Sequence, residues 1–194
     1  MRKYTRVMAA GALLGLGLWI ASQAANGRTD EKETKEAVQK LIETMKKDPA
    51  AAKKQAEEIA KKADLEDVMN LFKPRAKGGL GFNPKDDAKK DGIELKLQAI
   101  AKTAPAKMDL QNQAADYARL VEVAQAVAEI ASYAKVPKAQ TAGKGPKDWK
   151  QYTEDLKKGL HGLSDAVKAG DPAKVKTAAS AVNSACNNCH TDFR

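Results

Sequence analysis

The C-terminal stretch constrains the fold of this chain more than any other feature. It contains the only two cysteines, Cys186 and Cys189, and His190 follows them directly. C-x-x-C-H is the attachment signature of c-type haem, in which each thiol forms a thioether and the adjacent imidazole binds the iron. Apolar residues lead into the motif at alternating three- and four-residue spacing, from Val175 to Cys189. This pattern predicts a final helix that turns both cysteines toward the protein core.

A C-x-x-C pair also occurs in redox dithiols, in disulfides and in zinc sites. A redox dithiol is expected beside a βαβ pattern, and the sequence has none. A structural zinc site needs four ligands, but the chain has only two cysteines and two histidines, and His161 lies far from the motif. We therefore predict one covalent haem c, with Cys186 and Cys189 as the thioethers and His190 as the proximal iron ligand.

The N-terminal stretch has the features of a targeting segment. Arg2, Lys3 and Arg6 precede an uncharged apolar run over 7–21, and Ser22-Gln23-Ala24 supplies small residues for a signal peptidase. We predict a Sec-type bacterial signal peptide over 1–24, with an uncleaved membrane anchor as the alternative. Covalent haem attachment in bacteria takes place outside the cytoplasmic membrane, so a periplasmic or exported location fits both predictions.

The net charge is +9, and it falls to +6 once Arg2, Lys3 and Arg6 are removed. A basic surface suits an acidic redox partner protein, a membrane or nucleic acid. Export argues against nucleic acid, and membrane contact is expected only if the N-terminal segment is uncleaved. Solvated lysines interleaved with acidic residues account for most of the charge.

Lysine and alanine dominate the composition and only 5% of residues are aromatic, which favours an all-α fold. Periodicity and capping signals predict a series of helices. Their expected ranges are 35–47, 49–62, 65–72, 93–103, 109–131, 148–169 and 172–193. We expect a helical extension with a Gly-rich loop over 25–86 and an antiparallel four-helix bundle over 87–194. The loop over 75–84 is open to two interpretations, a plain surface loop or a backbone pressed against the haem.

The last quarter of the chain resembles a known family. Trp149 and Tyr152 open the third bundle helix, Gly170-Asp171-Pro172 forms a hairpin, and 185–194 reads ACNNCHTDFR. Together these features are similar to the class II c-type cytochromes, which comprise cytochrome c′ and its low-spin c-556-like relatives. The resemblance implies the four-helix architecture, haem iron held by His190, electron transfer or gas binding, and a possible homodimer. The first half of the chain departs from the family pattern.

The second axial ligand of the iron is constrained by the bundle topology. A hairpin at Gly170 places His161 opposite residue 180, about 15 Å along the axis from residue 190, which argues against ligation. Met108 is expected at the far end as well. Met69 is expected at the haem end, and low-spin members of the resembled family use a methionine early in the sequence as the sixth iron ligand. Simple hydrophobic packing is the other interpretation of Met69.

Arg75 and Lys77 fall in the loop expected at the haem end. Arginine is suited to bidentate pairing with carboxylates, so both residues are candidate partners of the haem propionates. A solvated basic rim that docks a partner protein is the alternative.

Three functions follow from these predictions. The first is an exported monohaem electron carrier with His190 and Met69 on the iron. The second is a five-coordinate haem protein, like cytochrome c′, that binds nitric oxide or carbon monoxide. The third is a non-redox accessory haem subunit. The sequence contains no catalytic triad, carboxylate pair or second metal motif, so we do not expect an enzyme.

Overall fold

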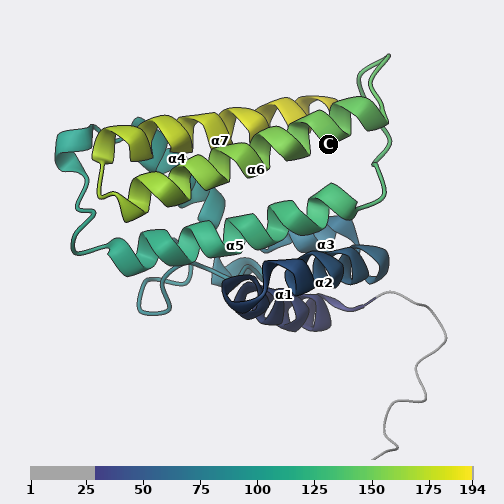
Figure 1. Cartoon of the computed structure of the whole chain (residues 1–194), viewed down its shortest axis with the longest axis horizontal. Coiled ribbons are helices and arrows are strands. Elements are labelled where there is room, and N and C mark those ends of the chain that lie inside the picture. Colours follow the sequence, from purple (N-terminus) through teal and green to yellow (C-terminus); the bar gives the residue numbers. More distant parts are fainter. Residues whose placement is uncertain (1–28, 194) are drawn as a thin grey trace, which may run out of the picture.

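The computed structural model describes residues 29–193, and this range is helical without any β-strand (Figure 1). The predicted signal segment over 1–24 lies outside the described residues. The described helices, in chain order, are α1 (Glu31–Lys47), α2 (Pro49–Lys62), α3 (Leu65–Asn70), α4 (Ile93–Lys102), α5 (Ala114–Tyr133), α6 (Pro146–Lys168) and α7 (Pro172–Phe193). Two short 3₁₀ helices, η1 (Arg75–Lys77) and η2 (Pro105–Lys107), lie in the connections. The all-α prediction is confirmed.

Aspartate caps set several helix boundaries. Asp48 accepts hydrogen bonds from the backbone N–H groups of Ala50 and Ala51, both at 3.0 Å, at the start of α2. Asp171 accepts equivalent bonds at 3.1 and 3.0 Å at the start of α7. In both helices a proline occupies the first position, where its missing N–H costs nothing. The predicted starts of these two helices are confirmed.

The predicted start of α5 at Asp109 is wrong. The Asp109 carboxylate accepts hydrogen bonds from the backbone and the side chain of Asn112, at 3.0 and 2.9 Å. These bonds close a local turn, as short aspartate side chains commonly do. The helix therefore begins only at Ala114.

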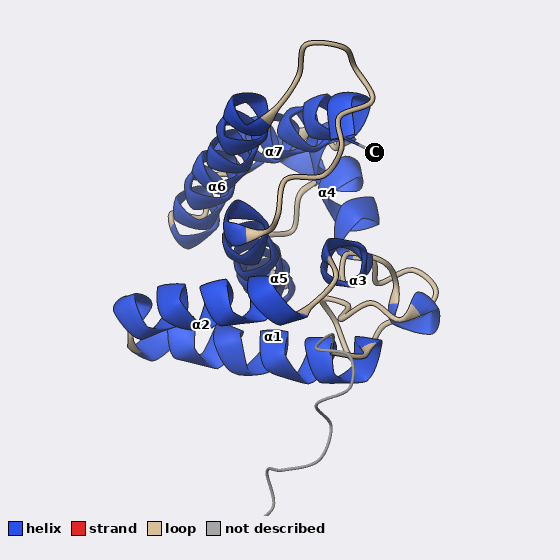
Figure 2. Cartoon of the chain, turned by 90° about the vertical axis from the view of Figure 1, so that its right-hand side faces the viewer, coloured by secondary structure: helices blue, strands red, loops and turns tan. Residues whose placement is uncertain are grey.

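Helices α4 to α7 form the bundle, and α6 and α7 run side by side in opposite directions (Figures 1 and 2). The α1–α2 hairpin packs on the other side of α5, so α5 lies between the hairpin and the rest of the bundle. Eleven of its residues are buried, which is more than one helical stripe supplies. One hydrophobic cluster continues from Val38 in α1 to Ala185 in α7. The predicted division near residue 86 stays a prediction.

The Gly-rich loop after α3 packs against the protein itself. A Cβ atom on Gly79 would clash with the carbonyl oxygen of Lys73, and one on Gly81 would clash with Asp91. Gly81 also has a φ of +64°, which favours glycine. The guanidinium of Arg75 forms an ion pair with the fully buried carboxylate of Asp91. This loop is thus held to its own neighbours, and the alternative of a backbone pressed against the haem stays a prediction.

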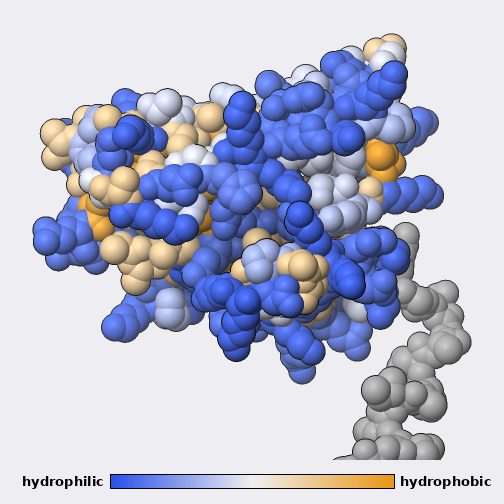
Figure 3. All heavy atoms as spheres, viewed as in Figure 1, coloured by the Kyte–Doolittle hydropathy of each residue, from blue (hydrophilic) through white to orange (hydrophobic). Residues whose placement is uncertain are grey.

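Hydrophilic side chains cover most of the face shown in Figure 3. This agrees with the interpretation of the lysines as largely solvated. Within residues 29–193, no helix combines the length and the apolar character needed to cross a membrane.

Candidate haem site

A cavity of about 140 Å³ lies beside the last turns of α7. Its walls come from the start of α4 (Glu94 and Leu97), the end of α5 (Ala131) and the start of α6 (Trp149 and Tyr152). These are the elements expected beside the C-terminal end of the final helix in an up-down-up-down bundle. Helix α3 closes the cavity, and it lies at the same end of the molecule as the C-terminus (Figure 1). A cavity therefore lies at the end of the bundle where the haem is expected, and its occupation by haem stays a prediction.

Cys186, Cys189 and His190 all line this cavity. Both cysteines are free thiols and are half-buried, whereas His190 is exposed. Cys186 packs against the main hydrophobic cluster and Cys189 against a second cluster around Trp149 and Phe193. The predicted inward orientation of the cysteines is confirmed. Its cause is the three- and four-residue spacing, which places both thiols on the buried face of α7.

Three aromatic rings support the cavity from the bundle side. Phe193 packs edge-on against Trp149 at 5.4 Å and against Tyr152 at 6.3 Å between ring centroids. The indole nitrogen of Trp149 donates to the carbonyl oxygen of Ala131 at 3.3 Å and so satisfies its only polar group. The rings thereby tie the ends of α5, α6 and α7 together.

A polar network lies at the edge of this aromatic group. The Tyr152 hydroxyl donates to Asp192 at 2.5 Å, and the Lys144 ammonium lies 3.3 Å from Asp192 and 3.2 Å from Asp148. The hydrogen bond from Tyr152 lowers the pKa of Asp192, and bonds to Tyr152, Asp148 and Asp192 raise the pKa of Lys144. Gln140 also donates its backbone N–H to the carbonyl oxygen of Asp192 at 2.7 Å. The network therefore fastens the loop before α6 to the last turn of α7.

Sequence reasoning missed Lys144, because it lies in a Pro/Gly-rich link with no local periodicity. The only available signal was its spacing of four residues from Asp148, which is an ion-pair spacing on a helix.

Burial keeps the two thiols protonated. It raises the pKa of Cys186 to about 11 and, together with the charge of Asp192, raises the pKa of Cys189 to about 11. Such thiols are poor nucleophiles and poor metal ligands at neutral pH. A dithiol redox function is therefore disfavoured by the geometry as well as by the sequence.

A larger cavity of about 1530 Å³ adjoins the first one. Met69 and His190 line both cavities, as do Leu65 and Phe193. Met69 is half-buried and contacts both hydrophobic clusters. The structure therefore brings together the imidazole and the thioether that the sequence analysis named as candidate iron ligands.

The candidate propionate partners and the second histidine lie outside these two cavities. The Arg75 guanidinium is engaged by Asp91 and by the carbonyl oxygens of Asn83 and Asp86, at 3.2 and 2.9 Å, and lines neither cavity. Lys77 lines neither cavity, whereas Lys73 lines the larger one. His161 and Met45 line a different cavity, on another side of α6.

Met108 packs against the main cluster and lines neither haem-side cavity. These positions agree with the prediction that His161 and Met108 lie too far from His190 to bind the same iron.

The residues present fit a c-type haem. Two free thiols one helical turn apart, an adjacent imidazole and a half-buried thioether surround a cavity whose other walls are mainly apolar and aromatic. Imidazole and thioether are both known axial ligands of haem iron. Within the described residues, no group of three or more His, Cys, Asp or Glu side chains could hold a separate metal ion. Fold and site together define a helical-bundle protein of the c-type haem class.

Residues 96–194 match the family described as Cytochrome C'. The match covers half of the chain, and the chain belongs to this family. No curated protein and no solved structure matches the chain significantly. The family implies haem c as the cofactor and a haem protein rather than a classical enzyme. Helices α1 to α3, the whole loop before α4 and the first three residues of α4 lie outside the match.

Proposed function

We propose that this protein is an exported electron carrier with one covalent haem c. The observation that carries the proposal is that Met69 of α3 and His190 of α7, which are far apart in the sequence, line the same pair of cavities. Haem bound there supplies a reversible one-electron couple at its iron. If the Met69 thioether and the His190 imidazole both bound the iron, the thioether would favour the reduced state and so raise the reduction potential, which suits electron transfer.

The protein side chains hold and shield this group. Cys186 and Cys189 would hold the haem through thioethers, and His190 would bind its iron. Trp149, Tyr152 and Phe193 form an apolar wall that excludes water from one side. The Lys144–Asp192 network limits movement of the α7 turn that carries the ligand.

The partner we propose is an acidic redox protein in the periplasm. The larger cavity, which His190 also lines, is lined by five lysines and three carboxylates, namely Lys61, Lys62, Lys73, Lys135 and Lys138 against Asp64, Glu66 and Glu94, so its lining is basic on balance. Complementary charge accelerates encounter between proteins and is weakened by salt. The basic start and apolar run over 2–21 support export. A homodimer stays a further proposal, drawn from the family resemblance.

Absorption spectra of the purified holoprotein test the ligand assignment. We expect a low-spin spectrum with a methionine–iron charge-transfer band. Met69→Ala should abolish this band and convert the iron to high spin. Met45→Ala is the matched control, because Met45 lines the cavity on the other side of the bundle and should leave the spectrum unchanged.

Other outcomes select the alternative functions. A wild-type spectrum that is already high-spin and shifts on addition of nitric oxide would establish the gas-binding function. Low-spin holoprotein that exchanges neither electrons nor ligands would indicate an accessory haem subunit. A mass without the haem increment after export would refute covalent attachment.

A further inference from the structure

Glu94 of α4 contributes a negative charge to the haem cavity. Among the described residues that line the smaller cavity it is the only acidic one, and none is a lysine or an arginine. Its side chain also lines the larger cavity, so it lies where the two spaces meet. The helix dipole favours an acidic residue in the first turn of a helix. That local preference does not account for a carboxylate in an otherwise apolar and aromatic cavity, so a role toward the haem is worth deriving.

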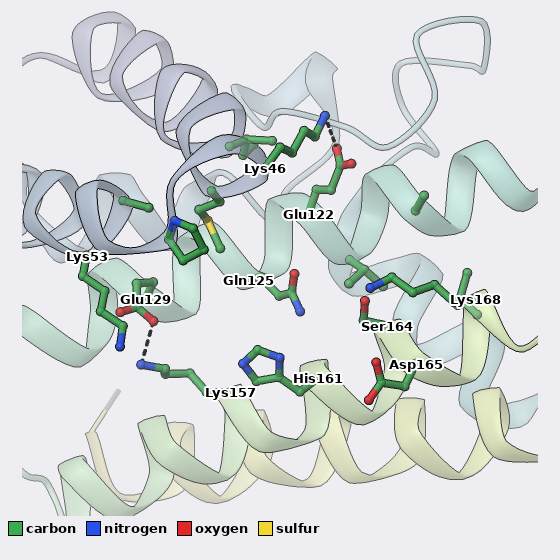
Figure 4. Close-up of a pocket in the computed structure, with 17 residues that line it drawn as sticks. Lys46, Lys53, Glu122, Gln125, Glu129, Lys157, His161, Ser164, Asp165 and Lys168 are labelled. Carbon is green, nitrogen blue, oxygen red and sulfur yellow. Dashed lines mark ion pairs between the residues drawn. The ribbon is translucent and has the colours of Figure 1, made fainter.

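The charge of Glu94 is not balanced by a neighbouring cation. Within residues 29–193 its carboxylate forms no ion pair, and its Oε1 atom accepts a hydrogen bond from the neutral side-chain amide of Gln98 at 3.2 Å. A separate cavity, between the α1–α2 hairpin and helices α5 and α6, contains a carboxylate in the opposite situation. There Glu122 is paired with Lys46 at 3.1 Å (Figure 4). Glu94 therefore presents an unpaired charge to the haem cavity.

This charge acts on one of the two motif cysteines. Helices α4 and α7, which carry Glu94 and Cys186, pack against each other. Burial is the main cause that raises the pKa of the Cys186 thiol to about 11, and the negative charge of Glu94 acts in the same direction. A haem attached through Cys186 would therefore lie in the electrostatic field of the same carboxylate.

A negative charge beside a redox centre favours the more positive oxidation state. Ferric haem carries one positive charge more than ferrous haem, so a nearby carboxylate stabilises the ferric form. We propose that Glu94 lowers the reduction potential of the haem iron through its negative charge. This inference rests on the proposed function, because it requires haem in the cavity. Residue 94 precedes the range 96–194 that matches the family, so this charge is a feature of the chain outside the match.

Potentiometric titration of the holoproteins, followed by visible absorption, measures this effect. Glu94→Gln keeps the shape of the side chain and an oxygen that can accept the bond from Gln98, so it removes little besides the charge. Because Glu94 is exposed and water screens its charge, we expect this change to favour the ferrous form about threefold, which is about 28 mV for a one-electron couple. Glu94→Lys reverses the charge and should favour the ferrous form about ninefold. Glu94→Asp retains the charge and should change the equilibrium by less than about 1.5-fold.

Glu122→Gln is the matched control, because it removes the same charge from a cavity that shares no lining residue with either haem-side cavity. It should change the equilibrium by less than about 1.5-fold at physiological salt. No shift in Glu94→Gln, or equal shifts in Glu94→Gln and Glu122→Gln, would overturn the proposal. A shift in Glu94→Asp as large as that in Glu94→Gln would also overturn it, by assigning the effect to side-chain shape. The mass and spectrum of the wild-type holoprotein decide the proposed function separately, so these outcomes leave it standing.

Discussion

The ion pair between Arg75 and Asp91 holds the loop that leads from α3 to α4. The Asp91 side chain is fully buried and the Arg75 side chain is 30% exposed. Removing the arginine with Arg75→Met leaves a buried carboxylate whose remaining partner is the Arg75 backbone N–H, at 3.0 Å. Breaking a buried pair in this way costs about 3–5 kcal/mol. Against a typical total stability of about 5–15 kcal/mol, this is a large loss.

Removing Asp91 should reduce the stability less than removing the Arg75 side chain does. In Asp91→Ala the guanidinium can turn to water and keep its bonds to the carbonyl oxygens of Asn83 and Asp86. The main penalty is an unsatisfied backbone N–H, about 1–3 kcal/mol. The double variant Arg75→Met/Asp91→Ala should be more stable than Arg75→Met alone, because it contains no unpaired buried charge.

Guanidinium unfolding of the holoproteins, followed by circular dichroism, measures these differences. Lys77→Met is the matched control: it removes an exposed cation two residues along the loop and should change stability by less than about 0.5 kcal/mol. The reasoning is refuted if Arg75→Met costs less than Asp91→Ala, or if the two single changes add up in the double variant.

Three further predictions concern the thiols, a cap and the helix packing. In the haem-free chain both motif thiols should react with iodoacetamide with a pH midpoint near 11, whereas the midpoint of a free cysteine is about 8.5; a midpoint below 9 would contradict their burial. Asp171→Ala should destabilise the protein at neutral pH, and the difference should vanish in acid unfolding curves as pH falls through the lowered pKa of Asp171, because hydrogen bonds to Lys174 and Ala173 favour its charged form. Gly162→Ala should increase the free energy of unfolding by about 0.5–1 kcal/mol through its higher helix propensity, which thermal unfolding would show as a higher midpoint. Gly159→Ala should increase stability less, because its new Cβ would lie 3.0 Å from Val182. Equal increases in the two variants would refute this packing argument.

The haem site was largely predictable from sequence because its signals are local. The C-x-x-C-H spacing, the stripe before it and the Asp-Pro caps each depend on residues within a few turns of one another. The short hairpin at Gly170 and the antiparallel order of the helices then place Trp149, Ala131 and Glu94 at the same end as Cys186. The extent of α5 was less predictable, since Asp109 had two competing local uses, a helix cap and a turn.

The helices, including the one that carries the C-x-x-C-H motif, and the end of the bundle at which the motif lies could be predicted, because periodicity and capping depend on neighbouring residues. Three features became apparent only in the folded chain: the hairpin that covers the second face of α5, the pairing of Arg75 with Asp91, and the pairing of Lys144 with Asp192. Those contacts join residues far apart in the chain, and a lysine or arginine that pairs at long range has the same local sequence signal as one in water. Glu129 is the clearest case, because its burial exists only when α2, α5 and α6 come together around it.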